Sequence, residues 1–170
     1  MALAEASLDR LGVCNRLNVL LLDREVSSLL PRFLELFSGL GLEVRGEGGL
    51  PLDRPLGHEW ASDPERVATV AVALVDGVDE AVRMANEETS GLAAGIATED
   101  AGAAERFLDG YRGAAGFWNA TTRFTDGFEL TGSPETGINV GRAPGPRGPV
   151  TYRDLWLRQY RVVGDGTQRR

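Results

Sequence analysis

The sequence predicts an α/β fold in which helices flank an open sheet, followed by a C-terminal arm. Its 170 residues are 42% hydrophobic and 25% charged, which fits one globular unit with a buried core. Short apolar runs alternate with stretches of helical spacing, a pattern typical of α/β proteins. Residues 142–170 hold seven arginines and two aspartates, whereas the rest of the chain is acidic. We therefore expect a domain body at 1–141 and, at 142–170, a Gly/Pro loop with an arm suited to oligomerisation or pairing between domains.

Three strands and one helix are predicted in the first half of the chain. The apolar run at 18–22 is bounded by polar residues and indicates a short buried strand. Apolar residues then recur at helical spacing over 26–40, and glycines end this helix. Residues 42–45 resume as a strand. The run at 67–75 is rich in β-branched side chains, and its length favours a third strand over a helix.

Helices and strands continue to alternate in the second half. Asp76 begins a helix with an apolar face, and the small-residue segment 91–98 predicts a strand. Asp100 opens a further helix, after which residues 113–120 return as a strand. Residues 131–149 are punctuated by Gly and Pro and therefore indicate a loop.

Composition excludes several classes of function. All 18 basic residues are arginine, so no reaction that needs a lysine from this chain can run. The net charge of −7 does not suit a nucleic-acid groove. Cys14 and His58 are the only residues of their types, so we expect no disulfide and no metal site. The longest apolar run, 67–75, is far shorter than the roughly 20 residues that span a bilayer. We expect a cytoplasmic protein without a membrane partner.

Cys14 precedes the first predicted strand and has three interpretations. Free cysteine is among the most buried residue types, so Cys14 is a small core residue in the first. In the second, a loop presents Cys14 as a nucleophilic thiolate with a lowered pKa, helped by Arg10, Arg16 and backbone N–H groups. The third is a hydrolase dyad with His58. The sequence by itself leaves all three open.

A polar segment, NATTRFTDG at 119–127, follows the end of a predicted strand. Ligands of open α/β sheets bind beyond the carboxyl ends of strands. The polar residues of this segment would therefore recognise an anion or substrate there: Thr122, Arg123, Thr125 and Asp126. Alternatively the segment is a structural turn in which Asp126 and Gly127 supply the bend and Arg123 pairs locally.

Considered together, these segments resemble the C-terminal catalytic part of the gamma-glutamyl phosphate reductases. Those enzymes are the glutamate-5-semialdehyde dehydrogenases of proline biosynthesis, in the aldehyde dehydrogenase superfamily. GVCNRLNVLLLD resembles the nucleophile segment of that family, HEW its Glu–aromatic pair, and NATTRFTDG its most characteristic loop. GSPETGINV, RGP, LRQY and VVGDG follow as the closing motifs of the family do. The resemblance runs from about residue 8 to residue 166.

The resemblance implies an NADP-dependent oxidoreductase with an aldehyde dehydrogenase-type catalytic domain. Cys14 would attack an acyl phosphate and form a thioester, which hydride from NADPH would reduce. Glu59 would reach toward the nicotinamide ribose. Four residues of NATTRFTDG would bind the substrate: Asn119, Arg123, Thr125 and Asp126. Only thirteen residues precede Cys14, so the N-terminal cofactor-binding domain of the family is expected to be absent. Either a partner chain supplies that domain, or this chain is a shortened product of a longer gene.

Two departures from the family pattern keep alternatives open. Asn18 stands where the family usually has a glutamate, and Leu92 and Ala93 replace a histidine-bearing stretch. SGLAAGIAT favours a general NAD(P)-dependent aldehyde dehydrogenase, whereas NATTRFTDG favours the reductase. The third alternative is a non-catalytic interaction remnant. The expected partners are a small-molecule substrate and further subunits, in a homo- or hetero-oligomer formed through the arm.

Overall fold

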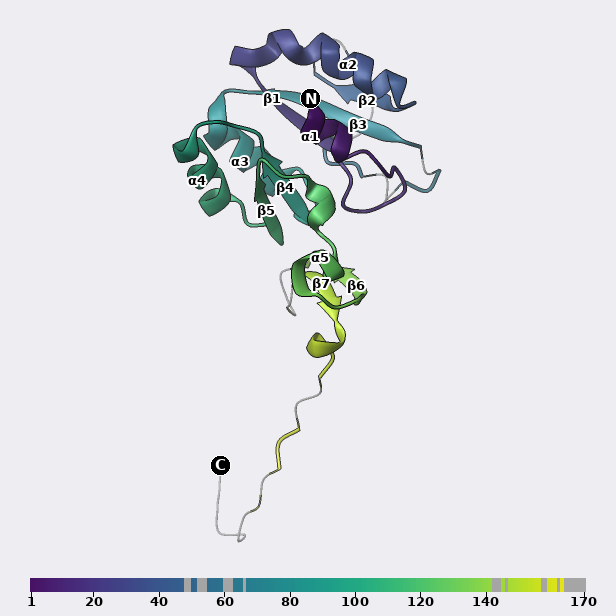
Figure 1. Cartoon of the computed structure of the whole chain (residues 1–170), viewed down its shortest axis with the longest axis vertical. Coiled ribbons are helices and arrows are strands. Elements are labelled where there is room, and N and C mark those ends of the chain that lie inside the picture. Colours follow the sequence, from purple (N-terminus) through teal and green to yellow (C-terminus); the bar gives the residue numbers. More distant parts are fainter. Residues whose placement is uncertain are drawn as a thin grey trace.

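The computed structural model describes residues 1–47, 50–51, 55–59, 63–65, 67–141, 145, 147–156, 159–161 and 163. Two parallel sheets and a C-terminal hairpin make up the fold, with helices packed beside the sheets (Figure 1). The α/β class expected from the alternating pattern is confirmed. Among the described residues, no helix has the length and apolar character needed to cross a bilayer.

The first sheet contains three parallel strands in the order β1-β3-β2. They are β1 (Val19–Asp23), β3 (Thr69–Val75) and β2 (Glu43–Gly46). β3 lies in the centre and six of its seven residues are buried, which explains why its sequence is a continuous apolar run. The short helix α1 (Ala2–Ala6) precedes this sheet in the chain.

The prediction of one helix over 26–40 is wrong in its first part. Arg24–Leu29 form the 3-10 helix η1, in which Val26 leaves helical geometry. The α-helix α2 (Leu30–Gly39) begins only there, with proline in its first turn. Proline lacks the N–H that an earlier turn would need, so a new helix starts at this point.

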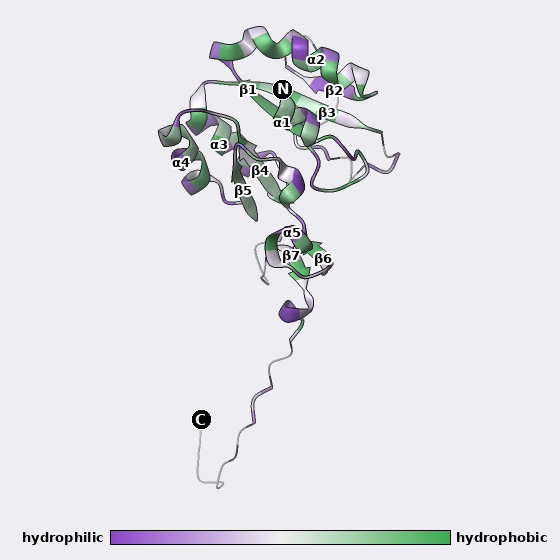
Figure 2. Ribbon diagram, viewed as in Figure 1, coloured by the Kyte–Doolittle hydropathy of each residue, from purple (hydrophilic) through white to green (hydrophobic). Residues whose placement is uncertain are grey.

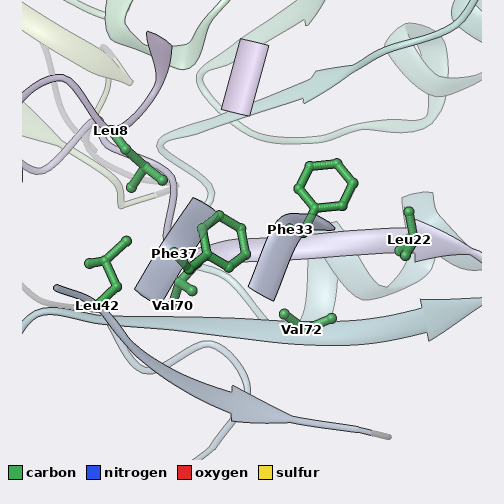
Figure 3. Packing of buried hydrophobic residues seen from close by; sticks show 7 residues of the cluster. All are labelled: Leu8, Leu22, Phe33, Phe37, Leu42, Val70 and Val72. Carbon is green, nitrogen blue, oxygen red and sulfur yellow. The ribbon is translucent and has the colours of Figure 1, made fainter. Parts of the chain in front are cut away.

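Packing of α2 on the first sheet creates the main core (Figure 3). Phe37 is fully buried, and its ring lies 6.0 Å from that of Phe33. Leu8 and Leu17 flank Cys14 in the chain and pack into the same cluster. The core therefore holds both ends of the segment that carries the cysteine.

The second sheet pairs β4 (Ala93–Ile96) with β5 (Ala115–Trp118), again in parallel. Helices α3 (Gly77–Glu87) and α4 (Ala101–Gly110) pack on one another beside it. Asp100 caps α4 by accepting from two backbone N–H groups, as its position in the sequence predicts. Leu21 of β1 packs into the second core, so the two sheets share an apolar junction.

The prediction of a loop over 131–149 is wrong in part, because this segment contains two strands. β6 (Glu135–Asn139) and β7 (Gly148–Thr151) form an antiparallel hairpin. The side chains of these two strands do not alternate between apolar and polar, and backbone pairing alone defines the strands. Apolar periodicity in the sequence therefore could not reveal the hairpin. The expected boundary at 141/142 falls between these two strands. All of VVGDG except Val163 lies outside the described residues, as do the arginines at 142, 158, 169 and 170 and the Trp60 of HEW.

Arg147 attaches the hairpin to the second sheet. Its guanidinium donates to the carbonyl oxygen of Arg112, to that of Gly91 at 3.4 Å and to that of Val140 at 3.2 Å. Beyond the hairpin, the short helix η4 (Tyr152–Asp154) and the described part of the tail extend away from the body (Figure 1).

Candidate active site

Cys14 lies in the loop between α1 and β1, where the amino edge of the first sheet meets the loop that follows β5. The thiol is free and half-buried. The backbone N–H groups of Cys14 and Asn15 donate toward its sulfur. If the sulfur attacked a substrate, an oxyanion would form on that substrate. The same two N–H donors would face this oxyanion.

Asn15 joins the cysteine loop to the NATTRFTDG loop. Its Nδ2 donates to the carbonyl oxygens of Thr125 at 2.9 Å and Arg123 at 3.3 Å. In return, Thr122 Oγ1 donates to the Asn15 carbonyl oxygen at 2.8 Å. The two segments predicted to carry the chemistry therefore meet, although more than a hundred residues separate them. Sequence reasoning did not single out Asn15; its position directly after the cysteine was the available signal.

Arg123 is held by groups of the cysteine loop. Its Nε donates to Asp9 Oδ1 at 2.6 Å, and its Nη1 donates to Asn15 Oδ1. Asp9 is largely exposed, whereas Arg123 is mostly covered. The turn interpretation expected Arg123 to pair locally, and this is wrong: both side-chain partners belong to the cysteine loop, more than a hundred residues away in sequence.

The other three residues of NATTRFTDG that are predicted to bind substrate are buried or bonded within the fold. Thr125 is 1% exposed and follows the 3-10 helix η3 (Thr122–Phe124), and its Oγ1 has no partner among the described residues. Asp126 caps helix α5 (Gly127–Thr131) by accepting from the N–H groups of Phe128 and Glu129. Asn119 has a positive φ of 51° and bonds through its amide to both backbone polar groups of Thr98.

Two carboxylates, Glu135 and Glu59, act electrostatically on the Cys14 thiol. Glu135 of β6 accepts from the Gly127 N–H at 2.9 Å, and Glu59 accepts from the Ser90 N–H at 3.4 Å. A Cβ at residue 127 would lie 2.8 Å from that of Glu135, so only glycine fits there. Sequence reasoning assigned Glu135 no role, and folding of the hairpin brings it near Cys14.

The Cys14 thiol has a raised pKa, so the expectation of a lowered one is wrong for this chain. Burial is the main cause, and the negative charges of Glu135 and Glu59 add to it; the N–H donors act in the opposite direction. The two arginines expected to help are directed elsewhere. Arg10 is exposed, and Arg16 bonds to the first residue of β3.

The histidine of the hydrolase alternative is held by an acid. His58 Nε2 lies 3.1 Å from Asp63 Oδ2, and Asp63 is almost fully buried. Among the residues that the structure describes, the groups that act on the Cys14 thiol are carboxylates and backbone amides, and the His58 imidazole is not among them. The geometry therefore gives the dyad no support.

The raised pKa leads to a testable expectation for Cys14 reactivity. Near pH 7 the thiol should react with iodoacetamide more slowly than a model thiol, because a raised pKa leaves less thiolate. Glu135→Gln should accelerate the reaction about two- to threefold, since it removes a charge and keeps an oxygen for Gly127. The rate is measured against pH on this single cysteine. Glu129→Gln, an exposed change on α5, is the control; an unchanged rate in Glu135→Gln would contradict the expectation.

The family model of the aldehyde dehydrogenase family matches residues 68–152, which is half of the chain. The chain belongs to the aldehyde dehydrogenase family. Its matched region begins just before β3 and ends in η4, so it includes both parallel strands of the second sheet and the hairpin. The resemblance found in the motifs is confirmed.

Relatives within the family share one name. The gamma-glutamyl phosphate reductase of Acidiphilium cryptum (strain JF-5) is 36% identical over 177 residues, covering 98% of this chain and 41% of the relative. That of Koribacter versatilis (strain Ellin345) is 33% identical, covering 96% and 42%. The crystal structure of the Thermotoga maritima gamma-glutamyl phosphate reductase matches with a TM-score of 0.81 at 28% identity, covering 99% of this chain and 42% of that one. The chain thus spans about two fifths of the length of these relatives.

Proposed function

We propose that this chain is the catalytic part of an NADPH-dependent reductase that converts gamma-glutamyl phosphate to glutamate-5-semialdehyde. The observation that carries the proposal is the junction of the Cys14 loop with the NATTRFTDG loop through Asn15. The named relatives match nearly the whole chain and supply the reaction. In the proposal Cys14 is the catalytic nucleophile.

The chemistry begins with attack of the Cys14 thiolate on the acyl phosphate carbon. A carbon–sulfur bond forms, the carbon–oxygen bond to phosphate breaks, and phosphate leaves with the electron pair. The N–H groups of Cys14 and Asn15 stabilise the oxyanion of this step. Hydride then reduces the thioester carbon, and cleavage of the carbon–sulfur bond releases the aldehyde and restores the thiolate. The hydride is what NADPH supplies when bound.

In this proposal the cofactor would approach from the side of Glu59. Glu59 lines an open hollow together with Glu87 and Glu88 and the residues around them. Carboxylates accept hydrogen bonds from hydroxyl groups and repel phosphates, so this hollow fits the uncharged ribose beside the nicotinamide. The pyrophosphate would be held by a cofactor-binding domain or a partner chain.

The substrate-binding role is proposed for Asn119, Arg123, Thr125 and Asp126. Arg123 has the charge for it, because its planar fork matches carboxylate or phosphate oxygens. Two of its nitrogens already bind Asp9 and Asn15, so a substrate anion would displace the exposed Asp9. Thr125, Asp126 and Asn119 would act by fixing the backbone of their loop.

We also propose that residues 142–170 form an arm that pairs with further subunits of a cytoplasmic oligomer, while 1–141 form the catalytic body. Large apolar side chains are exposed on α5 and after β7, and Figure 2 shows hydrophobic colour on this hairpin. Among them are Phe128, Leu155 and Trp156, each more than 60% exposed. Apolar surface of this extent favours a protein partner.

The proposed function is tested by joining this chain to the amino-terminal part of the Thermotoga maritima enzyme. The hybrid should oxidise glutamate-5-semialdehyde with NADP⁺ only when inorganic phosphate is present. Phosphate-independent oxidation of neutral aliphatic aldehydes would favour the general aldehyde dehydrogenase instead. The buried Leu92 at the start of β4 is the feature that keeps this second candidate under test.

Arg123→Ala should raise the KM for glutamate-5-semialdehyde in this hybrid by about 10-fold, equivalent to roughly 1.4 kcal/mol of binding. The loss follows from removal of the cation that would hold the substrate anion. Initial rates against semialdehyde concentration measure it, and a neutral aldehyde should be much less affected. Asp9→Asn is the matched control, because it releases Arg123 without removing its charge. An equal loss with both aldehydes would assign Arg123 a purely structural role.

A further inference from the structure

Asn15 directly follows the cysteine, and both polar atoms of its side chain are in use. The residue is 7% exposed. Its Nδ2 donates to the carbonyl oxygens of Thr125 at 2.9 Å and Arg123 at 3.3 Å, while its Oδ1 accepts from Arg123 Nη1. Only one orientation of the amide satisfies this pattern, since a flipped amide would turn its NH₂ group toward the guanidinium and its oxygen toward two carbonyls. The Asn15 side chain therefore holds both the backbone and the guanidinium of Arg123.

The guanidinium of Arg123 is divided between a buried and an exposed partner. The buried Asn15 holds Nη1, whereas Nε donates to Asp9 Oδ1 at 2.6 Å, and the Asp9 side chain is 56% exposed. Among the described residues, no hydrogen bond involves the third nitrogen, Nη2. Nε and Nη2 form one edge of the planar guanidinium, and a carboxylate or phosphate binds such an edge through two parallel hydrogen bonds. An anion that displaces Asp9 gains this whole edge while Asn15 keeps Nη1.

The contact between the two loops does not depend on the Asn15 side chain alone. Thr122 Oγ1 donates to the backbone carbonyl oxygen of Asn15 at 2.8 Å, and Ser7 Oγ lies 2.8 Å from Thr121 Oγ1. These bonds remain when the Asn15 amide is removed. Loss of the amide should therefore release the Arg123 guanidinium while the loops stay together.

We propose that Asn15 is a positioning residue that holds Arg123 on the cysteine loop with one guanidinium edge open to an anion, so that Cys14 reacts preferentially with anionic electrophiles. The inference rests on the proposed function in one respect, that the acyl phosphate substrate is an anion. The preference itself is a property of this chain. Asn15 acts through Arg123, which supplies the positive charge.

The test compares two alkylating reagents on Cys14, the single cysteine of the chain. Iodoacetate carries a carboxylate and iodoacetamide is neutral. With each reagent the thiolate attacks the methylene carbon, a carbon–sulfur bond forms, the carbon–iodine bond breaks and iodide leaves. Because both reagents consume the same thiolate, the ratio of their second-order rate constants does not depend on the thiol pKa. The rates are measured at pH 7.5 and low ionic strength, where charges are least screened.

Asn15→Ala should lower the ratio of the iodoacetate rate to the iodoacetamide rate by about threefold, because the cation is no longer fixed beside the thiol. Arg123→Ala should lower it to the same extent. Asp9→Asn should raise the ratio by about twofold, because it removes the carboxylate that competes for the open edge. In an Arg123→Ala background, Asn15→Ala should change the ratio by less than about 1.5-fold.

Asn86→Ala is the matched control. The Asn86 amide makes the same kind of bridge between α3 and the end of α4, donating to the Gly110 carbonyl oxygen at 3.0 Å and accepting from the Arg112 N–H at 2.7 Å. Its removal should leave the ratio at the wild-type value. If Asn15→Ala does not fold, as judged by circular dichroism, Asn15→Leu replaces it, since leucine is of similar size and lacks both polar atoms.

Three outcomes overturn the proposal. One is a wild-type ratio in Asn15→Ala, even if both rates change, which would leave Asn15 as a structural bridge between the loops. Another is an equal fall of the ratio in the wild-type and Arg123→Ala backgrounds, which would show that Asn15 acts without Arg123. The third is a lower ratio in Asp9→Asn, which would show that Asp9 does not compete with an anion for the guanidinium.

This experiment uses neither cofactor nor substrate. An inactive hybrid enzyme with the expected ratios would refute the proposed function and leave the role of Asn15 toward Arg123 intact. An active hybrid with a wild-type ratio in Asn15→Ala would do the reverse.

Discussion

Cys14→Ala should lower kcat/KM of the hybrid enzyme for glutamate-5-semialdehyde by about 10³-fold or more, equivalent to about 4 kcal/mol of transition-state stabilisation. The loss is large because no other residue of the chain can form the thioester: Cys14 is its single cysteine. A nucleophile divides the reaction into two easier steps, and without it both steps lose their shared intermediate. The rate of phosphate-dependent NADP⁺ reduction measures the effect.

The controls separate chemistry from folding. Cys14→Ala should keep the wild-type melting temperature within a few degrees, since the side chain is small and only half-buried. His58→Gln retains a group that can bond to Asp63, and it should keep nearly full activity. A fully active Cys14→Ala enzyme would refute the thioester mechanism, and an inactive His58→Gln enzyme that folds would revive the Cys/His dyad.

The strands and helices of the body could be predicted because each buries one apolar face or run. β3 shows this most clearly, since burial of six of its residues requires an uninterrupted apolar sequence. The hairpin of β6 and β7 could not be predicted in this way, because backbone hydrogen bonds hold it and its side chains are mostly outside the core. The division of the strands between two sheets also depends on tertiary contacts that no local pattern records.

The candidate site was predictable where a residue type carries the chemistry. Cys14 and the NATTRFTDG loop stand out as a lone thiol and a concentration of polar groups, and the fold brings their loops together. The electrostatics could not be predicted. The nearest arginine in sequence, Arg16, turns toward Thr69, while Glu135 reaches the cysteine from more than a hundred residues away. A pKa depends on which charges the fold assembles, and neighbours in sequence are a poor guide to that.

Phe37→Ala should lower the free energy of unfolding by about 3–5 kcal/mol, a large part of the roughly 5–15 kcal/mol of an ordinary domain. Phe37 is fully buried on α2 against Phe33, and removal of its ring leaves a cavity under the first sheet. Thermal unfolding followed by circular dichroism should show a drop in Tm of roughly 6–20 °C. Leu40→Ala, on the exposed end of the same helix, should cost about 1 kcal/mol or less and is the matched control.

Because Leu8 packs into the same core, the cavity should also loosen the loop of Cys14, so alkylation just below Tm should accelerate in Phe37→Ala alone. Equal Tm values in the two variants would contradict the placement of the main core beneath α2, and with it the anchoring of the catalytic loop.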